Sequence, residues 1–83
     1  MKDKRVLVVG MGRSGKAAVR ALADMGAKVS VQDSKSEDQL DAGFLHFLKE
    51  KGITGYLGCK PDGTEQFDTV VLSPGVPPAL DFI

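Results

Sequence analysis

The chain has 83 residues, of which 42% are hydrophobic and 27% charged, and its 11 basic and 11 acidic side chains cancel. This length fits one domain, over residues 1–83, and a neutral domain lacks the positive field of a nucleic-acid-binding protein. No apolar stretch approaches the roughly 18 residues of a membrane span, and the single Cys59 excludes an intrachain disulfide, so we expect a cytoplasmic protein that binds neither nucleic acid nor membrane.

The first predicted element is a buried strand over Arg5–Val9, which runs into three glycines with the spacing G-x-G-x-x-G. Gly10 allows a tight turn, Gly12 lets a phosphate approach the main chain, and Gly15 lets the next helix pack close to the sheet. The N-terminus of that helix would direct free N–H groups and a partial positive charge at a ligand. The stretch predicts a cradle for a nucleotide diphosphate, against the alternative of a glycine-rich turn that binds nothing.

The same residues resemble the start of a P-loop, because Gly10, Gly15 and Lys16 fit G-x-x-x-x-G-K. The next position of a P-loop is Ser or Thr, whose hydroxyl holds Mg²⁺, and here it is Ala17. An alanine cannot ligate a metal. We therefore expect no ATP-hydrolysing P-loop and no metal site in this stretch.

A helix over Ser14–Met25, ended by Gly26, follows the glycines. Helical spacing predicts its buried face: Ala18, Ala21, Leu22 and Met25. The alternating, β-branched segment Lys28–Gln32 predicts a second strand, which ends at Asp33.

A capping-box pattern, formed by Ser36 and Gln39, predicts the start of a second helix that Gly52 ends. The predicted apolar stripe of this helix consists of Leu40, Phe44, Phe47 and Leu48. His46 falls on the opposite side and should face water. Further strands are predicted over Ile53–Leu57 and Thr69–Leu72, with a turn-rich loop between them that contains Pro61-Asp62-Gly63.

Strands that alternate with helices predict an α/β fold, a Rossmann-like parallel sheet in the order 3-2-1-4. Ligands bind beyond the carboxyl ends of such strands. Three polar clusters should meet there: the glycine loop (Gly10–Gly15), Asp33-Ser34-Lys35, and Ser73-Pro74-Gly75. This convergence favours a nucleotide site more than any single motif does.

Asp33 lies 18 positions after Gly15, where Rossmann proteins place the acidic residue of the motif. Its carboxylate could accept hydrogen bonds from a ribose, as in an NAD-binding domain, or from the N–H of a base. It could also simply cap its own loop. These three interpretations of Asp33 remain open at the level of the residues.

The chain resembles the N-terminal domain of the Mur ligase family, in particular the D-glutamate-adding branch. The resemblance covers nearly the whole chain and depends on Val6–Gly15, on Asp33 and, most specifically, on the run Asp68-Thr69-Val70-Val71-Leu72-Ser73-Pro74-Gly75-Val76-Pro77. It implies that the domain holds the UDP part of UDP-N-acetylmuramoyl-L-alanine.

By this resemblance, the diphosphate faces the main chain around Gly12, Arg13, Ser14 and Gly15, with the Ser14 hydroxyl as a further donor. The resemblance assigns uracil to Asp33, with Ser34 and Lys35 lining that pocket, and assigns the opposite wall to Ser73, Pro74 and Gly75. Arg13 departs from the family, in which this position is often apolar and packs on the base. A guanidinium there would stack on the base or pair with a phosphate.

The resemblance also implies a multidomain parent ligase. In that enzyme ATP, with Mg²⁺, phosphorylates the alanine carboxylate, and the amine of D-glutamate attacks the acyl phosphate. The groups for those steps belong to central and C-terminal domains, so we expect residues 1–83 to be a catalytically silent, truncated domain with an exposed sheet edge. Two alternatives remain: the NAD-binding domain of a dehydrogenase or regulatory sensor, and an interaction domain whose cradle is vestigial.

Overall fold

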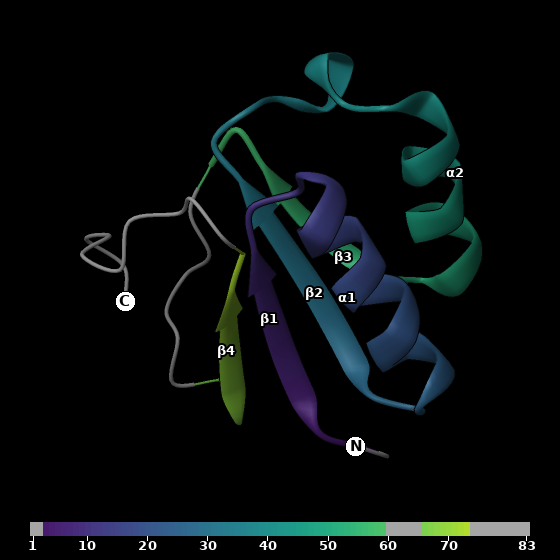
Figure 1. Ribbon diagram of the computed structural model, residues 1–83, viewed down its shortest axis with the longest axis vertical. Coiled ribbons are helices and arrows are strands. Elements are labelled where there is room, and N and C mark those ends of the chain that lie inside the picture. The colour runs from purple at the N-terminus through teal and green to yellow at the C-terminus, as the bar shows by residue number, and fades with distance from the viewer. Residues whose placement is uncertain (1–2, 60–65, 74–83) are drawn as a thin grey trace.

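The computed structural model describes residues 3–59 and 66–73, which form one parallel sheet with helices packed against it (Figure 1). The elements in chain order are β1 (Arg5–Val9), α1 (Arg13–Asp24), β2 (Lys28–Asp33), the 3₁₀-helix η1 (Glu37–Gln39), α2 (Ala42–Lys51), β3 (Thr54–Leu57) and β4 (Thr69–Leu72). All the pairings are parallel and the strand order is β3-β2-β1-β4, so the predicted α/β fold and its 3-2-1-4 order are confirmed.

β1 lies in the middle of the sheet because nearly all of its residues are apolar and buried. The four residues after Arg5 are each at most 1% exposed: Val6, Leu7, Val8 and Val9. Side chains alternate between the two faces of a strand, and Val6 and Val8 belong to the core shared with the helices. A strand buried on both faces requires the continuous apolar run that the sequence shows.

Both helices pack on the same face of the sheet, since residues of α1 and α2 belong to one core with β1 and β2. The contacts between the helices include a guanidinium over aromatic rings. The Arg20 guanidinium lies 4.5 Å from the ring centre of Phe47 and 5.9 Å from that of Phe44. These contacts stabilise the position of α1, whose N-terminus lies at the glycine loop.

The buried face of α1 differs from the predicted one. Leu22 is buried and Ala18 is partly buried, as expected, but Ala21 is exposed and Met25 is 51% exposed. The buried residues are instead Gly15, Val19 and Leu22. The reason is the close contact of Gly15 with the glycine loop, which rotates the helix so that the face containing Gly15 meets the sheet.

The second predicted helix is divided into two elements. The capping box of Ser36 and Gln39 is present, but it begins the short 3₁₀-helix η1, after which Leu40 is extended with φ −103° and ψ 160°. The α2 helix begins only after Asp41, whose side chain accepts a hydrogen bond from the N–H of Phe44. A second N-cap close to the first one therefore marks the true start of the α-helix.

The end of α2 and the neighbouring strands follow the prediction closely. Gly52 ends the helix with φ 68°, in the left-handed region that glycine adopts without strain. β2 extends one residue further than predicted, to Asp33, and β3 begins one residue later, at Thr54. Among the described residues, no helix has the length and apolar character needed to cross a membrane.

Candidate functional site

The carboxyl ends of β1, β2 and β4 lie side by side, as the strand order requires. Hydrogen bonds continue past the strands at this edge. The N–H of Gly10 donates to the carbonyl of Gln32 at 2.7 Å, and the N–H of Ser73 donates to the carbonyl of Val9 at 3.0 Å. The described parts of the three polar clusters therefore share one rim, as predicted.

The three glycines of the motif have different surroundings. Gly10 has φ 91°, a conformation that favours glycine and turns the chain out of β1. A Cβ on Gly15 would lie 1.9 Å from the carbonyl oxygen of Gly10 and 2.6 Å from the Ser73 hydroxyl. A Cβ on Gly12 would meet nothing within 4 Å. Of Gly12 and Gly15, it is therefore Gly12 that faces open space that a ligand could occupy.

The N-terminus of α1 has hydrogen-bond donors without acceptors from the described part of the chain. Gly12 is the N-cap and has no side chain with which to cap the helix, and the first turn contains no acidic residue. The N–H groups of Arg13, Ser14 and Gly15 receive no hydrogen-bond acceptor from residues 3–59 or 66–73. Arg13 and Ser14 are exposed. The helix thus offers water or an anion its N–H groups and the positive end of its dipole.

Asp33 is engaged by the main chain of the protein itself. Its Oδ2 atom accepts a hydrogen bond from the N–H of Met11 at 2.6 Å, and its Oδ1 atom accepts one from the N–H of Lys35 at 2.8 Å. The second contact is the loop cap that was one of the three open interpretations. The first contact was not predicted, and it joins the end of β2 to the glycine loop. Each carboxylate oxygen keeps a second lone pair for another donor.

Ser73 supports the glycine loop from the other side. Its side chain is buried, and its hydroxyl donates to the carbonyl oxygen of Gly10 at 2.7 Å. Pro74 and Gly75, the other two residues expected in this wall, lie outside the described residues.

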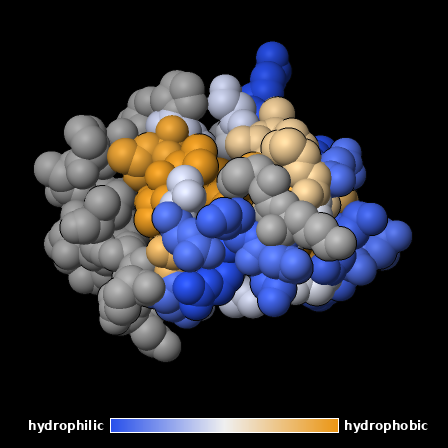
Figure 2. Space-filling model, turned by 90° about the horizontal axis from the view of Figure 1, so that it is seen from below, coloured by the Kyte–Doolittle hydropathy of each residue, from blue (hydrophilic) through white to orange (hydrophobic). Residues whose placement is uncertain are grey.

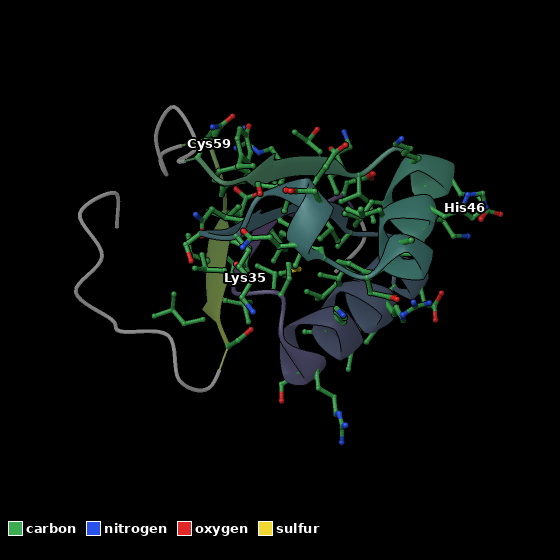
Figure 3. The ribbon with its side chains drawn as sticks, turned by 90° about the horizontal axis from the view of Figure 1, so that it is seen from above. Lys35, His46 and Cys59 are labelled. Carbon is green, nitrogen blue, oxygen red and sulfur yellow. The ribbon has the colours of Figure 1, made fainter. Side chains whose placement is uncertain are left out.

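Ser34 and Lys35 are both exposed at the rim. A shallow cavity of about 270 Å³ adjoins this region, lined by Gln32, Ser34, Gly58 and Cys59. Figure 3 looks onto this edge of the sheet and shows Lys35 and Cys59 following strand ends, with His46 on the outer side of α2. His46 is exposed, as predicted, and pairs with Glu50 at 3.5 Å on the same helix.

Two contacts at the rim were not predicted from the sequence, because an apolar side chain and an amide side chain do not by themselves indicate a role in a site. Met11 is 3% exposed and belongs to the core, so the residue between the first two glycines anchors the loop. The Gln32 side chain is 6% exposed and donates to the carbonyl oxygen of Cys59 at 3.0 Å. A large apolar residue between two glycines is the signal that could have predicted the Met11 anchor.

Lys16 and Ala17 follow the glycines on α1, where the sequence resembles the start of a P-loop. Lys16, which would reach the phosphates in a P-loop, has its Nζ atom 5.6 Å from the ring centre of Phe44. Ala17 is exposed. Within the described residues, no cluster of His, Cys, Asp or Glu side chains is suited to a metal ion.

A second cavity, of about 530 Å³, lies at the opposite edge, where the strands begin. Arg5, Lys28 and Lys51 line it together with apolar residues such as Ile53 and Phe67. Figure 2 views the molecule from this side and shows a hydrophobic area bordered by hydrophilic residues. The C-termini of α1 and α2 lie at this edge, and cations there complement the helix dipoles. Although this cavity is larger, the free N–H donors are at the other edge, which we take as the site.

A family model described as the N-terminal domain of MurD-like Mur ligases matches residues 4–83. The UDP-N-acetylmuramoylalanine--D-glutamate ligase of Koribacter versatilis is 49% identical over 78 residues, which are 93% of this chain and 17% of that protein. The enzyme of the same name from Desulfitobacterium hafniense is 48% identical over 84 residues, covering 100% of this chain and 18% of the relative. The Myxococcus xanthus enzyme is 43% identical, with 96% and 18% covered. The chain therefore spans less than a fifth of the length of these relatives.

Proposed function

The chain belongs to the MurD-like family of Mur ligase N-terminal domains, and on that premise we propose that it binds the UDP moiety of UDP-N-acetylmuramoyl-L-alanine. The binding edge is the one formed by the carboxyl ends of β1, β2 and β4. The observation that carries the proposal is the open space at Gly12, directly before the free N–H groups of α1. A tetrahedral oxyanion such as a phosphate group fits such a helix N-terminus without any further cation.

The diphosphate would accept hydrogen bonds from the N–H groups of Arg13, Ser14 and Gly15, and from the Ser14 hydroxyl. The Arg13 side chain is exposed beside them and supplies a positive charge. Because the chain has a formal net charge of zero, attraction for the ligand would come from these short-range groups and not from a field over the whole protein.

Uracil would lie toward the end of β2. We propose that its N–H donates to a free lone pair of the Asp33 carboxylate, with Ser34 and Lys35 beside it. Ser73, Pro74 and Gly75 would form the opposite wall. The engagement of Asp33 with the N–H groups of Met11 and Lys35 leaves one acceptor position on each oxygen for this contact.

The whole protein would be an ATP-dependent ligase that adds D-glutamate during cytoplasmic synthesis of peptidoglycan precursors. ATP and Mg²⁺ would be bound by the central and C-terminal parts of such a protein, and residues 1–83 would supply the substrate-binding surface without catalysing the reaction. The family membership and the names of the relatives support this assignment.

Parallel titrations with UDP-N-acetylmuramoyl-L-alanine, UDP, NAD and ATP, followed by calorimetry and by amide chemical shifts, test the proposal. We expect weak binding of the two uridine ligands, with the largest shifts at Gly12, Arg13 and Ser14. Preferential binding of NAD would instead assign the chain to dinucleotide recognition. If none of the four nucleotides bound, the cradle would be vestigial and the proposal would be wrong.

A matched pair of variants separates the cradle from the fold. Gly12→Val places a side chain in the space assigned to phosphate, where the structure offers no clash, and should abolish uridine binding with the fold retained. Ala17→Val changes an exposed position of the same helix and should leave binding unchanged. Unaltered affinity in Gly12→Val would contradict the proposed position of the diphosphate.

A further inference from the structure

The Asp33 carboxylate contacts the glycine loop directly. The distance from its Oδ2 atom to the main-chain nitrogen of Met11 is 2.6 Å, slightly shorter than the usual range for an N–H···O hydrogen bond. Asp33 is only partly exposed, so solvent screens the contact incompletely. The Asp33 carboxylate thus holds the main-chain N–H of Met11, the residue that lies between Gly10 and Gly12.

Three contacts together fix the loop before any ligand arrives. The Met11 side chain is in the hydrophobic core. The Met11 N–H is held by Asp33, and the Gly10 carbonyl is held by the Ser73 hydroxyl at 2.7 Å. Without such contacts, a loop with two glycines in three residues would have more conformational freedom than a loop built of other residues. The contacts from β2 and β4 remove that freedom.

We propose that Asp33 is a positioning residue for the diphosphate: by holding the Met11 peptide, it presets the glycine loop in the shape that receives the anion. This inference rests on the proposed function and deepens it, because it assigns Asp33 a role toward a part of the ligand that it does not touch. Asp33 acts on the diphosphate through the main chain, independently of any contact that it makes with the base.

The direction of the effect distinguishes this role from simple electrostatics. A carboxylate near a bound anion repels it, so removal of the charge alone would strengthen the binding of a diphosphate. Loss of the Met11 contact has the opposite effect, since the ligand must then order the loop itself. A uracil contact, by contrast, has no influence on a ligand that lacks a base.

The test measures the binding of UDP and of inorganic pyrophosphate to the wild-type chain and to Asp33→Asn. An asparagine can accept from one of the two N–H groups but presents its own amide hydrogens to the other. We expect Asp33→Asn to weaken the binding of both ligands by about tenfold, which corresponds to about 1.4 kcal/mol. Asp33→Ala, which removes both acceptors, should weaken it at least as much.

Asp38→Asn is the matched control. Asp38 is an exposed acid in η1, and its carboxylate pairs with the hydroxyl of Ser36 and not with the glycine loop. The control removes one negative charge and should leave pyrophosphate binding within about twofold of wild type, since a charge this exposed is screened by solvent. Thermal unfolding of each variant shows whether the fold is retained.

Hydrogen exchange of the Met11 amide reads the contact without a ligand. The inference requires faster exchange of this amide in Asp33→Asn, with the amides of β1 still protected. Unchanged pyrophosphate binding, or tighter binding, in an Asp33→Asn chain that remains folded would overturn the positioning role and leave the proposed function standing. If the wild-type chain bound neither UDP nor pyrophosphate, the proposed function would be overturned, and the inference with it.

Discussion

Replacement of Gly12 by serine should stabilise the protein and weaken its proposed binding at the same time. Gly12 has φ −74° and ψ −170°, which any L-residue adopts without strain, and a Cβ there meets no atom within 4 Å. It is the N-cap of α1, a position at which serine accepts a hydrogen bond from the N–H of the second or third helical residue. These residues are Ser14 and Gly15.

The gain in stability has two sources. Serine is better than glycine at an N-cap by a few tenths of a kcal/mol. Removal of glycine also lowers the conformational entropy of the unfolded chain, which stabilises by about 0.4–1 kcal/mol where the native backbone is unstrained. Together these terms give about 0.5–1.5 kcal/mol, or a rise in Tm of about 3–10 °C for a domain of this size.

The loss of binding follows from the same hydroxyl. It would occupy the donors that we assign to the diphosphate, and its bulk would fill the space in front of them. We expect the affinity for UDP to fall by at least about tenfold, the factor equivalent to about 1.4 kcal/mol. Calorimetric unfolding and UDP titration of the same samples measure the two effects side by side.

Two results would refute this reasoning. A destabilised Gly12→Ser chain would mean that the space beside Gly12 is filled and that α1 does not begin there. A stabilised chain with wild-type affinity would mean that the helix N-terminus is free but is not where the anion binds. Gly58→Ser is unsuitable as a control because Gly58 has φ 76°. Ala17 is exposed on α1, and Ala17→Ser should leave the affinity unchanged while lowering stability by about 0.5 kcal/mol through the weaker helix propensity of serine.

Substitutions at three further positions test other parts of the structure. Gly15→Ala should cost about 3 kcal/mol or more in urea unfolding, since its Cβ would lie 1.9 Å from a main-chain oxygen that cannot move aside alone; a cost below about 1 kcal/mol would refute the close contact. The main-chain N–H of Arg5, and then its guanidinium, lower the pKa of Asp68 below 3.8, so this carboxylate contributes stability above its ordinary pKa that is lost as the pH falls through the lowered value. Asp68→Asn should therefore show a shallower fall of Tm between about pH 5 and about pH 2, and an unchanged slope would contradict the assignment. Arg20→Ala should lower the free energy of unfolding by about 0.5–1 kcal/mol through its contact with Phe47, and Arg20→Lys should recover part of that loss.

The central part of the fold was predictable because its sequence signals are local and agree with one another. The apolar run after Arg5 predicts a strand buried on both faces, and Thr69–Leu72 is bounded by residues that end a strand. The predicted ranges Arg5–Val9 and Thr69–Leu72 are those of the structure. The start of α2 was not predictable in the same way. The capping box at Ser36 is real, but whether it begins a 3₁₀-helix or an α-helix depends on the extended conformation of Leu40.

The face of α1 depended on a contact between residues distant in sequence. Helical spacing alone allows Leu22 to share a buried stripe either with Met25 or with Val19 and Gly15. The choice is made by the distance between Gly15 and the Gly10 carbonyl, together with the Ser73 hydroxyl that packs against both. No periodicity in the sequence contains that information.

In the candidate site too, the sequence predicts where a residue lies but not which group it contacts. The spacing from the glycines to Asp33 predicts that the carboxylate and the loop meet at one edge of the sheet, and they do. This spacing does not specify which donor the Asp33 carboxylate faces, because a ribose hydroxyl, the N–H of a base and a main-chain N–H can all donate a hydrogen bond to it. The structure supplies the Met11 N–H, which no residue-type pattern could reveal since every residue except proline has one.

These contacts would explain how a loop rich in glycine could serve as the proposed binding site. A cradle built from main-chain N–H groups has no side-chain rotamers to immobilise when a ligand binds, but its glycines lose more backbone entropy on ordering than other residues do. In this protein that ordering takes place on folding, through the Met11 side chain in the core, the Asp33 carboxylate and the Ser73 hydroxyl. On the proposed function, a diphosphate that reached Gly12 would meet donors already in place, and its affinity would depend on residues at the ends of β2 and β4 as well as on the motif itself.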